Sequence, residues 1–311
     1  MTCSIVIPTF NSEKKIGHNL NKLVENIPKD VEIIVVDDGS KDDTINIINN
    51  FIYSSKRKNM TLIEKEHTNP ANTRNEGWNE AKGEFIIFLD SDCEVTKNWY
   101  EEMLKPFEEK GIVGVSGVYL SMQTKFISKY IHKQTEYRQN KIKKYTDNLA
   151  TYSLAVKRKL LERIKGFPEN YPYASCEDTE FSYKLRRYGK FVLNRKAKVV
   201  HIHEESIKGY LKKQFNHARY RVLMFKRGNP VGDKYAGMDI LVQPFLAFIS
   251  LLFPFNNFFI FFFGAIIVLQ MMEIEGTLDN FTFFLFSAII GTIRAYVWLI
   301  GIIVGVIEFY V

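Results

Sequence analysis

The sequence lacks the cysteine pattern of a disulfide-rich or zinc-binding protein. Its three cysteines, Cys3, Cys93 and Cys176, are far apart and form no Cys-x-x-Cys pair. An odd count at such spacing excludes a disulfide framework and a zinc knuckle. We therefore expect three buried or half-buried thiols in a reducing compartment.

Charged residues are scarce in the last quarter of the chain. Residues 239–311 hold one basic residue, Arg294, and five acidic ones, whereas residues 1–238 hold 41 Lys and Arg against 30 Asp and Glu, a net charge of +11. The apolar runs 240–272 and 281–311 each exceed the length of about 20 residues that a membrane-spanning helix needs. We expect transmembrane helices, two to four spans in residues 239–311, and therefore an integral membrane protein.

We also expect no signal peptide in residues 1–10, because they have no basic start and no long apolar run and instead predict a strand. Eight Lys and Arg against one Asp lie between Lys208 and Lys234, next to the first apolar run. The positive-inside bias then places the soluble part on the cytoplasmic face. Residues 206–238 are expected to form a basic helical region at the membrane surface.

The first part of the chain alternates strand and helix patterns. Val31–Val36 and Glu84–Leu89 are apolar apart from one glutamate each, as in strands that are buried on both faces. Helical spacing occurs in residues 13–25 and 70–81. This alternation predicts an α/β fold with a mostly parallel sheet flanked by helices, and we assign residues 1–205 to it as one catalytic domain.

Polar side chains follow three of the predicted strands. Pro8, Thr9 and Asn11 end the first, and Asp37 and Asp38 end the second. The second group is equally typical of a turn followed by a helix cap. Since ligands of open parallel sheets bind at the carboxyl ends of the strands, the three strand ends together predict one cleft.

Asp90 and Asp92 follow the third of these strands, Glu84–Leu89. Two carboxylates at this spacing can share a hard cation with substrate phosphate oxygens, although an Asp-x-Asp pattern is also common in turns. Further along, His201 and His203 alternate on a predicted strand, so their rings are expected on the same side. Imidazole nitrogens can complete a metal site that carboxylates begin.

Acidic residues also open a predicted helix, at Glu177, Asp178 and Glu180. The helix dipole favours acidic residues in a first turn, which is a sufficient structural reason for one of them. Three acids in four positions exceed that need. A carboxylate that faces the cleft predicts a general base for an incoming hydroxyl group.

Taken together, these segments resemble glycosyltransferase family 2. The resemblance rests on IVIPTFN at 5–11, VDDGS at 36–40, TRNEG at 73–77, GEFIIFLDSD at 83–92, GF at 166–167, EDTEF at 177–181 and LRRYG at 185–189. It covers about residues 3–205. It implies the GT-A fold, with a Rossmann-like mixed, mostly parallel sheet, and an inverting transferase that uses a UDP- or GDP-linked sugar.

The resemblance also implies a role for each motif residue. Asp178 would be the general base, with Glu177 beside it. Asp92 would ligate Mn²⁺ or Mg²⁺, Asp90 would approach the ribose or the metal, and His201 or His203 would be the later metal-side histidine. The nucleotide pocket would be lined by Thr9, Asp37, Asp38 and Arg74, next to Pro8 and Asn11 at the first strand end.

One motif of processive family members, Gln-x-x-Arg-Trp, is not matched. Gln214 and Arg219 have a different spacing, and no Trp follows them. We therefore expect a non-processive enzyme. Arg219 is a candidate ligand of the donor diphosphate, while a basic helix on anionic lipid explains the same charge.

The expected acceptor is lipid-linked. Residues 123–144 are basic and rich in aromatic residues, which suits a lipid phosphate near the bilayer. We expect a polyprenyl- or dolichyl-linked acceptor, as in surface glycan synthesis or protein glycosylation. A catalytically inactive membrane scaffold that binds a nucleotide sugar is the alternative. We expect no nucleic-acid partner, because the positive charge gathers beside the apolar segments, and the sequence indicates no oligomeric state.

Overall fold

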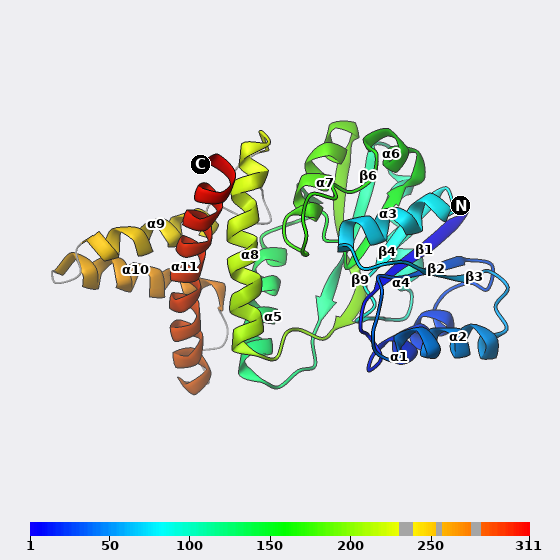
Figure 1. The fold of residues 1–311 in the computed structure, drawn as a ribbon, viewed down its shortest axis with the longest axis horizontal. Coiled ribbons are helices and arrows are strands. Elements are labelled where there is room, and N and C mark those ends of the chain that lie inside the picture. Colours follow the sequence, from blue (N-terminus) through cyan, green and yellow to red (C-terminus); the bar gives the residue numbers. More distant parts are fainter. Residues whose placement is uncertain (230–238, 253–256, 275–280) are drawn as a thin grey trace. The chain divides into compact units, whose positions relative to one another are not determined.

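The computed structural model describes residues 1–229, 239–252, 257–274 and 281–311, and the chain divides into two compact units (Figure 1). The first unit comprises Met1–Leu120 and Lys143–Ile202, and the second comprises Ser121–Ile142 and His203–Val311. The second segment of the second unit begins at His203. The second unit also includes residues 121–142, which we had assigned to the first domain, because their apolar side packs in a cluster with Tyr210, Ile274 and Phe283.

The amino-terminal half of the first unit is a parallel α/β layer. Its strands follow the order β3-β2-β1-β4, and each pair in this series is parallel. One helix connects each strand to the next. The elements are β1 (Cys3–Thr9), α1 (Ile16–Glu25), β2 (Glu32–Asp37), α2 (Thr44–Ser55), β3 (Met60–Glu64), α3 (Pro70–Glu80) and β4 (Phe85–Leu89).

The sheet continues with mixed strand directions. β8 is antiparallel to β4 and to β6, β9 is parallel to β6, and both β5 and β7 are antiparallel to β9. The remaining strands are β5 (Cys93–Val95), β6 (Ile112–Leu120), β7 (Tyr145–Thr146), β8 (Ser153–Lys157) and β9 (Lys190–His201). The helices here are α4 (Trp99–Leu104), α6 (Arg158–Ile164) and α7 (Glu177–Leu185), with 3₁₀ turns at Lys105–Glu108 and Arg186–Tyr188.

Both faces of the sheet are buried, which explains the unbroken apolar runs in the sequence. Ile33 and Val35 of β2 belong to one hydrophobic cluster, whereas Ile34 and Val36 belong to the other. Neighbouring residues of a strand point to opposite faces, so each face needs its own apolar residues. The expected α/β fold, a mixed sheet flanked by helices, is confirmed.

The second unit is helical. It contains α5 (Phe126–Asn140), α8 (Ile207–Lys226), α9 (Asp239–Leu252), α10 (Asn257–Glu273) and α11 (Phe281–Tyr310). Among the described residues, α11 is the one helix that is long and apolar enough to cross a membrane. Shorter apolar helical stretches occupy Val242–Leu252 and Ile260–Glu273. Two to four spans were expected in residues 239–311, whereas one of the described helices reaches spanning length.

Candidate active site

The ends of β1 and β2 bring the first polar groups together. Thr9 and Asp37 are register partners in this parallel pair, and the Asp38 N–H donates to the Thr9 carbonyl oxygen over 2.9 Å. Thr9 and Asp37 are both buried. The Thr9 hydroxyl has no hydrogen-bond partner among the described residues. A buried hydroxyl without a partner is unfavourable, so this position suits a bond to a ligand.

Asp37 and Asp38 have different local roles. Asp37 accepts hydrogen bonds from the backbone N–H and the hydroxyl of Ser40, at 2.7 and 2.5 Å, which is the turn that the alternative interpretation expected. Asp38 pairs with the Lys65 ammonium at 2.7 Å and accepts the Thr68 N–H at 3.0 Å. Burial alone would raise the pKa of Asp38, but these two donors outweigh it and the pKa lies below its ordinary value. Asp38 is therefore charged at neutral pH.

Pro8 and Asn11 flank Thr9 and shape the loop that follows β1. Pro8 is the last strand residue before Thr9 and is partly exposed. Asn11 has a positive φ of 47°, a conformation that Asn tolerates better than most residues. Its N–H donates to the Ser40 hydroxyl at 2.8 Å, and its side-chain oxygen accepts the Lys41 N–H at 2.9 Å. Asn11 thus ties the loops after β1 and β2 together.

Arg74 connects the end of β4 with α7. Its helix, α3, begins at Pro70 after Asn69, whose side chain accepts the Asn72 N–H. The buried guanidinium lies 2.9 Å from Asp90 Oδ1 and 3.5 Å from Glu177 Oε1. Burial lowers the pKa of Arg74, but Asp90 and Glu177 raise it above its ordinary value. The Arg74 Nε–H has no partner among the described residues and is a second buried donor available to a ligand.

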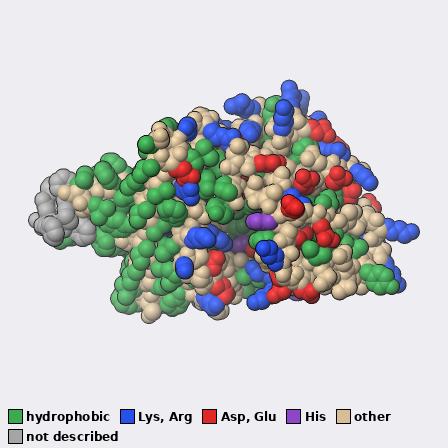
Figure 2. Space-filling view, viewed as in Figure 1, with side chains coloured by type: hydrophobic (Ala, Val, Ile, Leu, Met, Phe, Trp, Pro, Cys, Tyr) green, Lys and Arg blue, Asp and Glu red, His purple; other side chains and the backbone are tan. Residues whose placement is uncertain are grey.

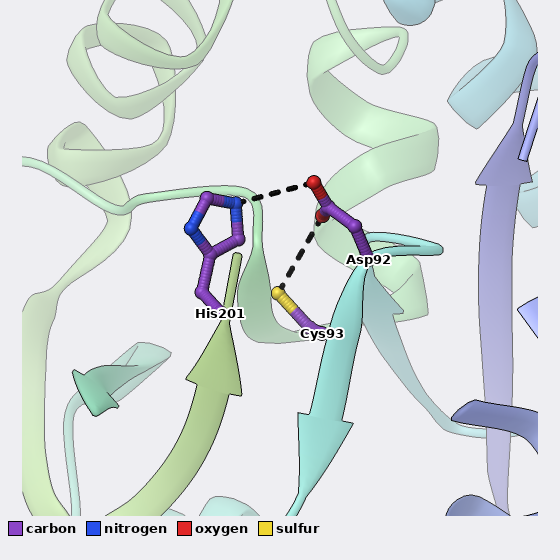
Figure 3. A group of neighbouring side chains, drawn as sticks. All are labelled: Asp92, Cys93 and His201. Atoms are coloured by element: carbon purple, nitrogen blue, oxygen red, sulfur yellow. Dashed lines mark hydrogen bonds and ion pairs between the residues drawn. The ribbon is translucent and has the colours of Figure 1, made fainter. Parts of the chain in front are cut away.

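A candidate metal group lies where β5 pairs with β9 (Figure 3). Cys93 and His201 are register partners in this antiparallel pair, and Asp92 comes just before β5. Asp92 Oδ2 is 3.3 Å from His201 Nε2, and the Cys93 thiol is 3.9 Å from Asp92 Oδ1. The ligand atoms of all three residues lie within 4.8 Å of one another.

Two of these three side chains suit a divalent cation. Burial, together with the Asp92 carboxylate, raises the pKa of the metal-free Cys93 thiol well above its ordinary value. Sulfur is also a soft donor, whereas Mn²⁺ and Mg²⁺ prefer oxygen ligands. The carboxylate of Asp92 and the imidazole of His201 form a donor set that Mn²⁺ or Mg²⁺ accepts when phosphate oxygens complete the coordination. Lys15 Nζ is 3.8 Å from Asp92 Oδ2, the oxygen that also faces His201. The residues present therefore fit a divalent cation.

Asp90 and His203, which we had also named as metal ligands, have other partners. Asp90 pairs with Arg74, as described above. The His203 Nε2 lies 3.3 Å from Nδ1 of His132, and both residues belong to the second unit. β9 ends at His201, so the alternation that predicted two rings on one side does not extend to His203. Arg219, the candidate diphosphate ligand, also lies in the second unit, where it forms an ion pair with Glu308.

The acidic residues of α7 occupy its first turn. Glu180 accepts the Tyr171 hydroxyl at 2.7 Å, which gives it a structural role. Glu177 faces Arg74, and its other oxygen accepts the Ser175 N–H at 2.7 Å; burial raises its pKa, against the effect of Arg74. Asp178 is partly exposed and accepts its neighbour's N–H at 2.7 Å.

The pKa of Asp178 is raised to about 7, first by burial and then by the charge of Glu177. Asp178 and Glu177 interact, so the shift belongs to the pair as much as to either residue. A carboxyl group that titrates near neutral pH holds a proton more tightly than one in water. It is suited to accept a proton from a hydroxyl group.

Three residues of this region were not anticipated from the sequence. They are Lys65 beside Asp38, Lys15 beside Asp92, and Cys93 in the metal group. Lys65 directly follows β3, whose last residues pair with the end of β2. Lys65 lies at the end of a third parallel strand, and this position in the sequence could have predicted it as a site residue. For Lys15 the sequence carries no comparable signal, since it lies in a loop between β1 and α1.

Comparison with known sequences places the motif segments before residue 166 in one family. Residues 4–165 match the family described as Glycosyl transferase family 2. The poly(ribitol-phosphate) beta-glucosyltransferase of Bacillus spizizenii is 43% identical over 108 residues, which are 32% of this chain and 17% of that protein. The GalNAc(5)-diNAcBac-PP-undecaprenol beta-1,3-glucosyltransferase of Campylobacter jejuni is 29% identical over 171 residues, 54% of this chain and 55% of that protein. The chain thus spans about half or less of these relatives' length.

Solved structures share the fold. The mannosyltransferase PcManGT from Pyrobaculum calidifontis, in complex with GDP-Man and Mn²⁺, superposes with a TM-score of 0.61 at 18% identity, covering 96% of this chain and 86% of that one. GalNAc-T7 with UDP, GalNAc and Mn²⁺ gives a TM-score of 0.55 at 18% identity, covering 75% and 52%. At this level of identity the similarity establishes the architecture, which is the GT-A-like fold expected.

Proposed function

Because the chain belongs to glycosyltransferase family 2, we propose that it moves a sugar from a nucleotide-diphosphate-sugar to a membrane-associated acceptor, with inversion and with a divalent metal. The observation that carries the proposal is the ion-pair chain through Arg74. It joins Asp90, two residues before the candidate metal ligand Asp92, to Glu177, which precedes the candidate base Asp178. Candidate groups for leaving-group stabilisation and for proton transfer are thus connected within the first unit.

The proposed reaction is a single displacement. The acceptor hydroxyl oxygen attacks the anomeric carbon, its proton passes to the Asp178 carboxylate, and the bond from that carbon to the donor diphosphate breaks. Attack from the face opposite the leaving group inverts the anomeric carbon. The partial burial and raised pKa of Asp178 support its assignment as the base.

Asp92 and His201 are the residues proposed to hold the metal. When bound, a divalent cation would supply charge stabilisation for the departing nucleoside diphosphate. Arg74 would keep Asp90 oriented and bring positive charge to the same region. Asp90 itself is proposed to approach the donor ribose rather than the metal, which its pairing with Arg74 supports.

The nucleotide is proposed to bind at the ends of β1 and β2. The buried Thr9 hydroxyl and the Arg74 Nε–H are donors that lack partners among the described residues, and Asp38 is a charged acceptor. The two structural neighbours carry UDP or GDP-Man. We propose a UDP- or GDP-linked sugar for this chain.

The acceptor is proposed to be polyprenyl- or dolichyl-linked, on a surface glycan or protein glycosylation pathway, and extended by one sugar per encounter. Three observations support this. The name of the Campylobacter relative includes a PP-undecaprenol substrate. The second unit contains the apolar helices α9, α10 and α11. The basic cluster of α8 favours attachment from the cytoplasmic side.

Transfer by detergent-purified protein tests the proposal. UDP- and GDP-sugars would be offered with Mn²⁺ or Mg²⁺, with a lipid-linked acceptor or the same sugar without lipid, and the anomeric form of the product read by NMR. We expect one donor class to be consumed, metal to be required, and the lipid-linked acceptor to be preferred. Donor binding without turnover under every condition would instead identify the protein as an inactive nucleotide-sugar-binding scaffold.

A further inference from the structure

α11 exposes a stripe of uncharged side chains along its length, with the exposed Glu308 beside it near the carboxyl end. Most of its exposed large apolar side chains recur three, four or seven residues apart, as on one side of a helix. The opposite side is buried and includes Arg294, Gly301 and Gly305. Figure 2 shows hydrophobic side chains gathered over the helices of the second unit. The stripe consists of Phe281, Leu285, Ile289, Ile293, Ile300, Ile303, Ile307 and Tyr310.

The carboxyl-terminal half of α11 is paired with α8. A Cβ atom on Gly301 would lie 2.7 Å from the Ala218 Cβ, so the two backbones are in close contact. The contacts advance in the same direction along both helices, which therefore run parallel. They are Gln214 with Trp298, Ala218 with Gly301, Arg219 with Glu308 and Lys226 with the Phe309 carbonyl oxygen.

The amino-terminal half of α11 is covered by α5. The Phe126 ring packs against Phe283 and Phe286, with centroids 5.5 and 5.6 Å away. α8 and α11 run side by side in Figure 1, with α5 partly behind α8, whereas α9 and α10 run across α8 and α11. The helices that cover α11 are not apolar. They expose lysines at Lys129 on α5 and at Lys208, Lys212, Lys213 and Lys226 on α8.

A buried polar network holds α5 and α8 to the apolar helices. Arg294 of α11 forms an ion pair with Glu273 of α10 at 3.0 Å and donates to Gln243 of α9 at 2.6 Å. Gln134 of α5 donates to Glu273 at 2.5 Å and accepts the Tyr210 hydroxyl of α8 at 3.0 Å. All five helices contribute, and separating α5 or α8 from the group would leave buried polar atoms without partners. The basic helices therefore stay beside α11.

We infer that α11 lies along the surface of a bilayer with anionic headgroups, instead of crossing it, and that both its ends are on the same side. A spanning helix needs about 20 residues in the hydrocarbon layer. If any stretch of about 20 residues of α11 lay there, exposed lysines of α5 or α8 would be buried in the same layer. In the surface position the apolar stripe enters the acyl chains while the lysines reach the headgroup phosphates. The inference rests on the membrane attachment proposed above and not on sugar transfer.

Depth measurements along the stripe test the inference. Full-length variants Leu285→Cys, Ile293→Cys, Ile300→Cys and Ile307→Cys would carry a nitroxide label in vesicles that contain anionic phospholipid. The depth of each label would be read from its collisions with oxygen and with a water-soluble nickel complex. We expect one shared depth. A helix that crosses the bilayer would change depth by about 33 Å between the first and last label, at 1.5 Å per residue.

The protein without an added cysteine is the negative control for labelling, because its three cysteines are all buried. Lys212→Cys on α8 is the matched control and is expected at the headgroups, accessible to the nickel complex. Vesicle flotation comes first. If the protein does not float with anionic vesicles, this inference and the proposed membrane attachment both fail, while sugar transfer is judged separately. If it floats and the labels show a depth gradient with the middle deepest, only the surface position of α11 is overturned.

Discussion

At the scale of single residues, Asp178 carries the first prediction. Below pH 7 its carboxyl group is largely protonated, since burial and Glu177 raise its pKa to about 7, and a protonated acid cannot accept the acceptor's proton. We expect kcat/KM for transfer to rise with pH through about 7 and then level off. Asp178→Asn should lower kcat by about 10²–10⁴ and leave donor affinity nearly unchanged. A pH-independent rate between pH 5.5 and 8.5 would contradict the assignment.

His201 and His203 are separated by one residue, so alanine variants of the two can be compared directly. His201 contacts Asp92, whereas His203 contacts His132. We expect His201→Ala to weaken Mn²⁺ binding by about tenfold or more. Loss of a residue that only hydrogen-bonds to a metal ligand typically weakens metal binding by about 10–100-fold, and loss of a ligand should weaken it further. His203→Ala should leave it nearly unchanged. Titration of Mn²⁺ by electron paramagnetic resonance, with UDP or GDP present, measures both. Equal losses in the two variants would argue against His201 as the ligand.

Arg74 is predicted to matter for stability as well as for the site. Both it and Glu177 are buried, so removing the guanidinium leaves a buried carboxylate without its counter-charge. Breaking one side of a buried pair typically costs about 3–5 kcal/mol. Arg74→Met should lower the free energy of unfolding by roughly this amount, and Arg74→Lys by less, because an ammonium retains part of the pairing. Denaturant unfolding of the purified protein gives both values.

At the scale of elements, Gly77 sets how closely α3 approaches the sheet. A Cβ atom there would lie 2.3 Å from Val6 Cγ1 and 3.0 Å from Val36 Cγ2. Gly77→Ala would push α3 away from β1 and β2 and displace Arg74 on the same helix. We expect a loss of stability of about 1–3 kcal/mol, as for other overpacked cores, and a weaker affinity for the donor.

Gly264 of α10 provides the control for this substitution, because a Cβ atom there meets nothing within 4 Å. Gly264→Ala should be neutral or stabilising by up to about 1 kcal/mol, since alanine favours a helix interior. Thermal unfolding in detergent compares the two. If Gly77→Ala were as stable as Gly264→Ala, the close packing of α3 on the sheet would not hold.

At the scale of the whole molecule, charge and hydropathy divide along the chain. Residues 1–238 carry a net charge of +11, while the apolar helices carry almost no charge. Moving a lysine to the centre of a bilayer costs about 2.5–3.5 kcal/mol on insertion scales, so burying several exposed lysines of α8 would be strongly unfavourable. The same lysines contribute about 1 kcal/mol each near an anionic surface.

This division predicts a salt dependence. Binding to vesicles with anionic lipid should weaken as ionic strength rises, because the Debye length shortens from about 10 Å at 0.1 M to about 3 Å at 1 M. Part of the binding should persist at high salt, since the apolar stripe of α11 does not depend on charge. A flotation series with anionic and with purely zwitterionic vesicles measures both parts. Identical binding to both vesicle types at low salt would exclude the electrostatic contribution.

The sequence by itself determined the fold class, the family and the segments that contain the candidate site residues. Strand ends, turn residues and the acidic helix start are set by short contiguous stretches, so local patterns and motif order were enough to find them. The apolar character of residues 239–311 was equally visible, because the hydropathy of a segment does not depend on its neighbours.

Only the tertiary structure decided which of these groups face one another. The pairing of Arg74 with Glu177, the place of His201 at the end of β9, and the grouping of residues 121–142 with the apolar helices all join residues far apart in the sequence. The contacts of α11 with α5 and α8 are also tertiary. The length and composition of α11 do not show which helices pack against it. Such contacts follow from packing and strand register, which no short stretch of sequence contains.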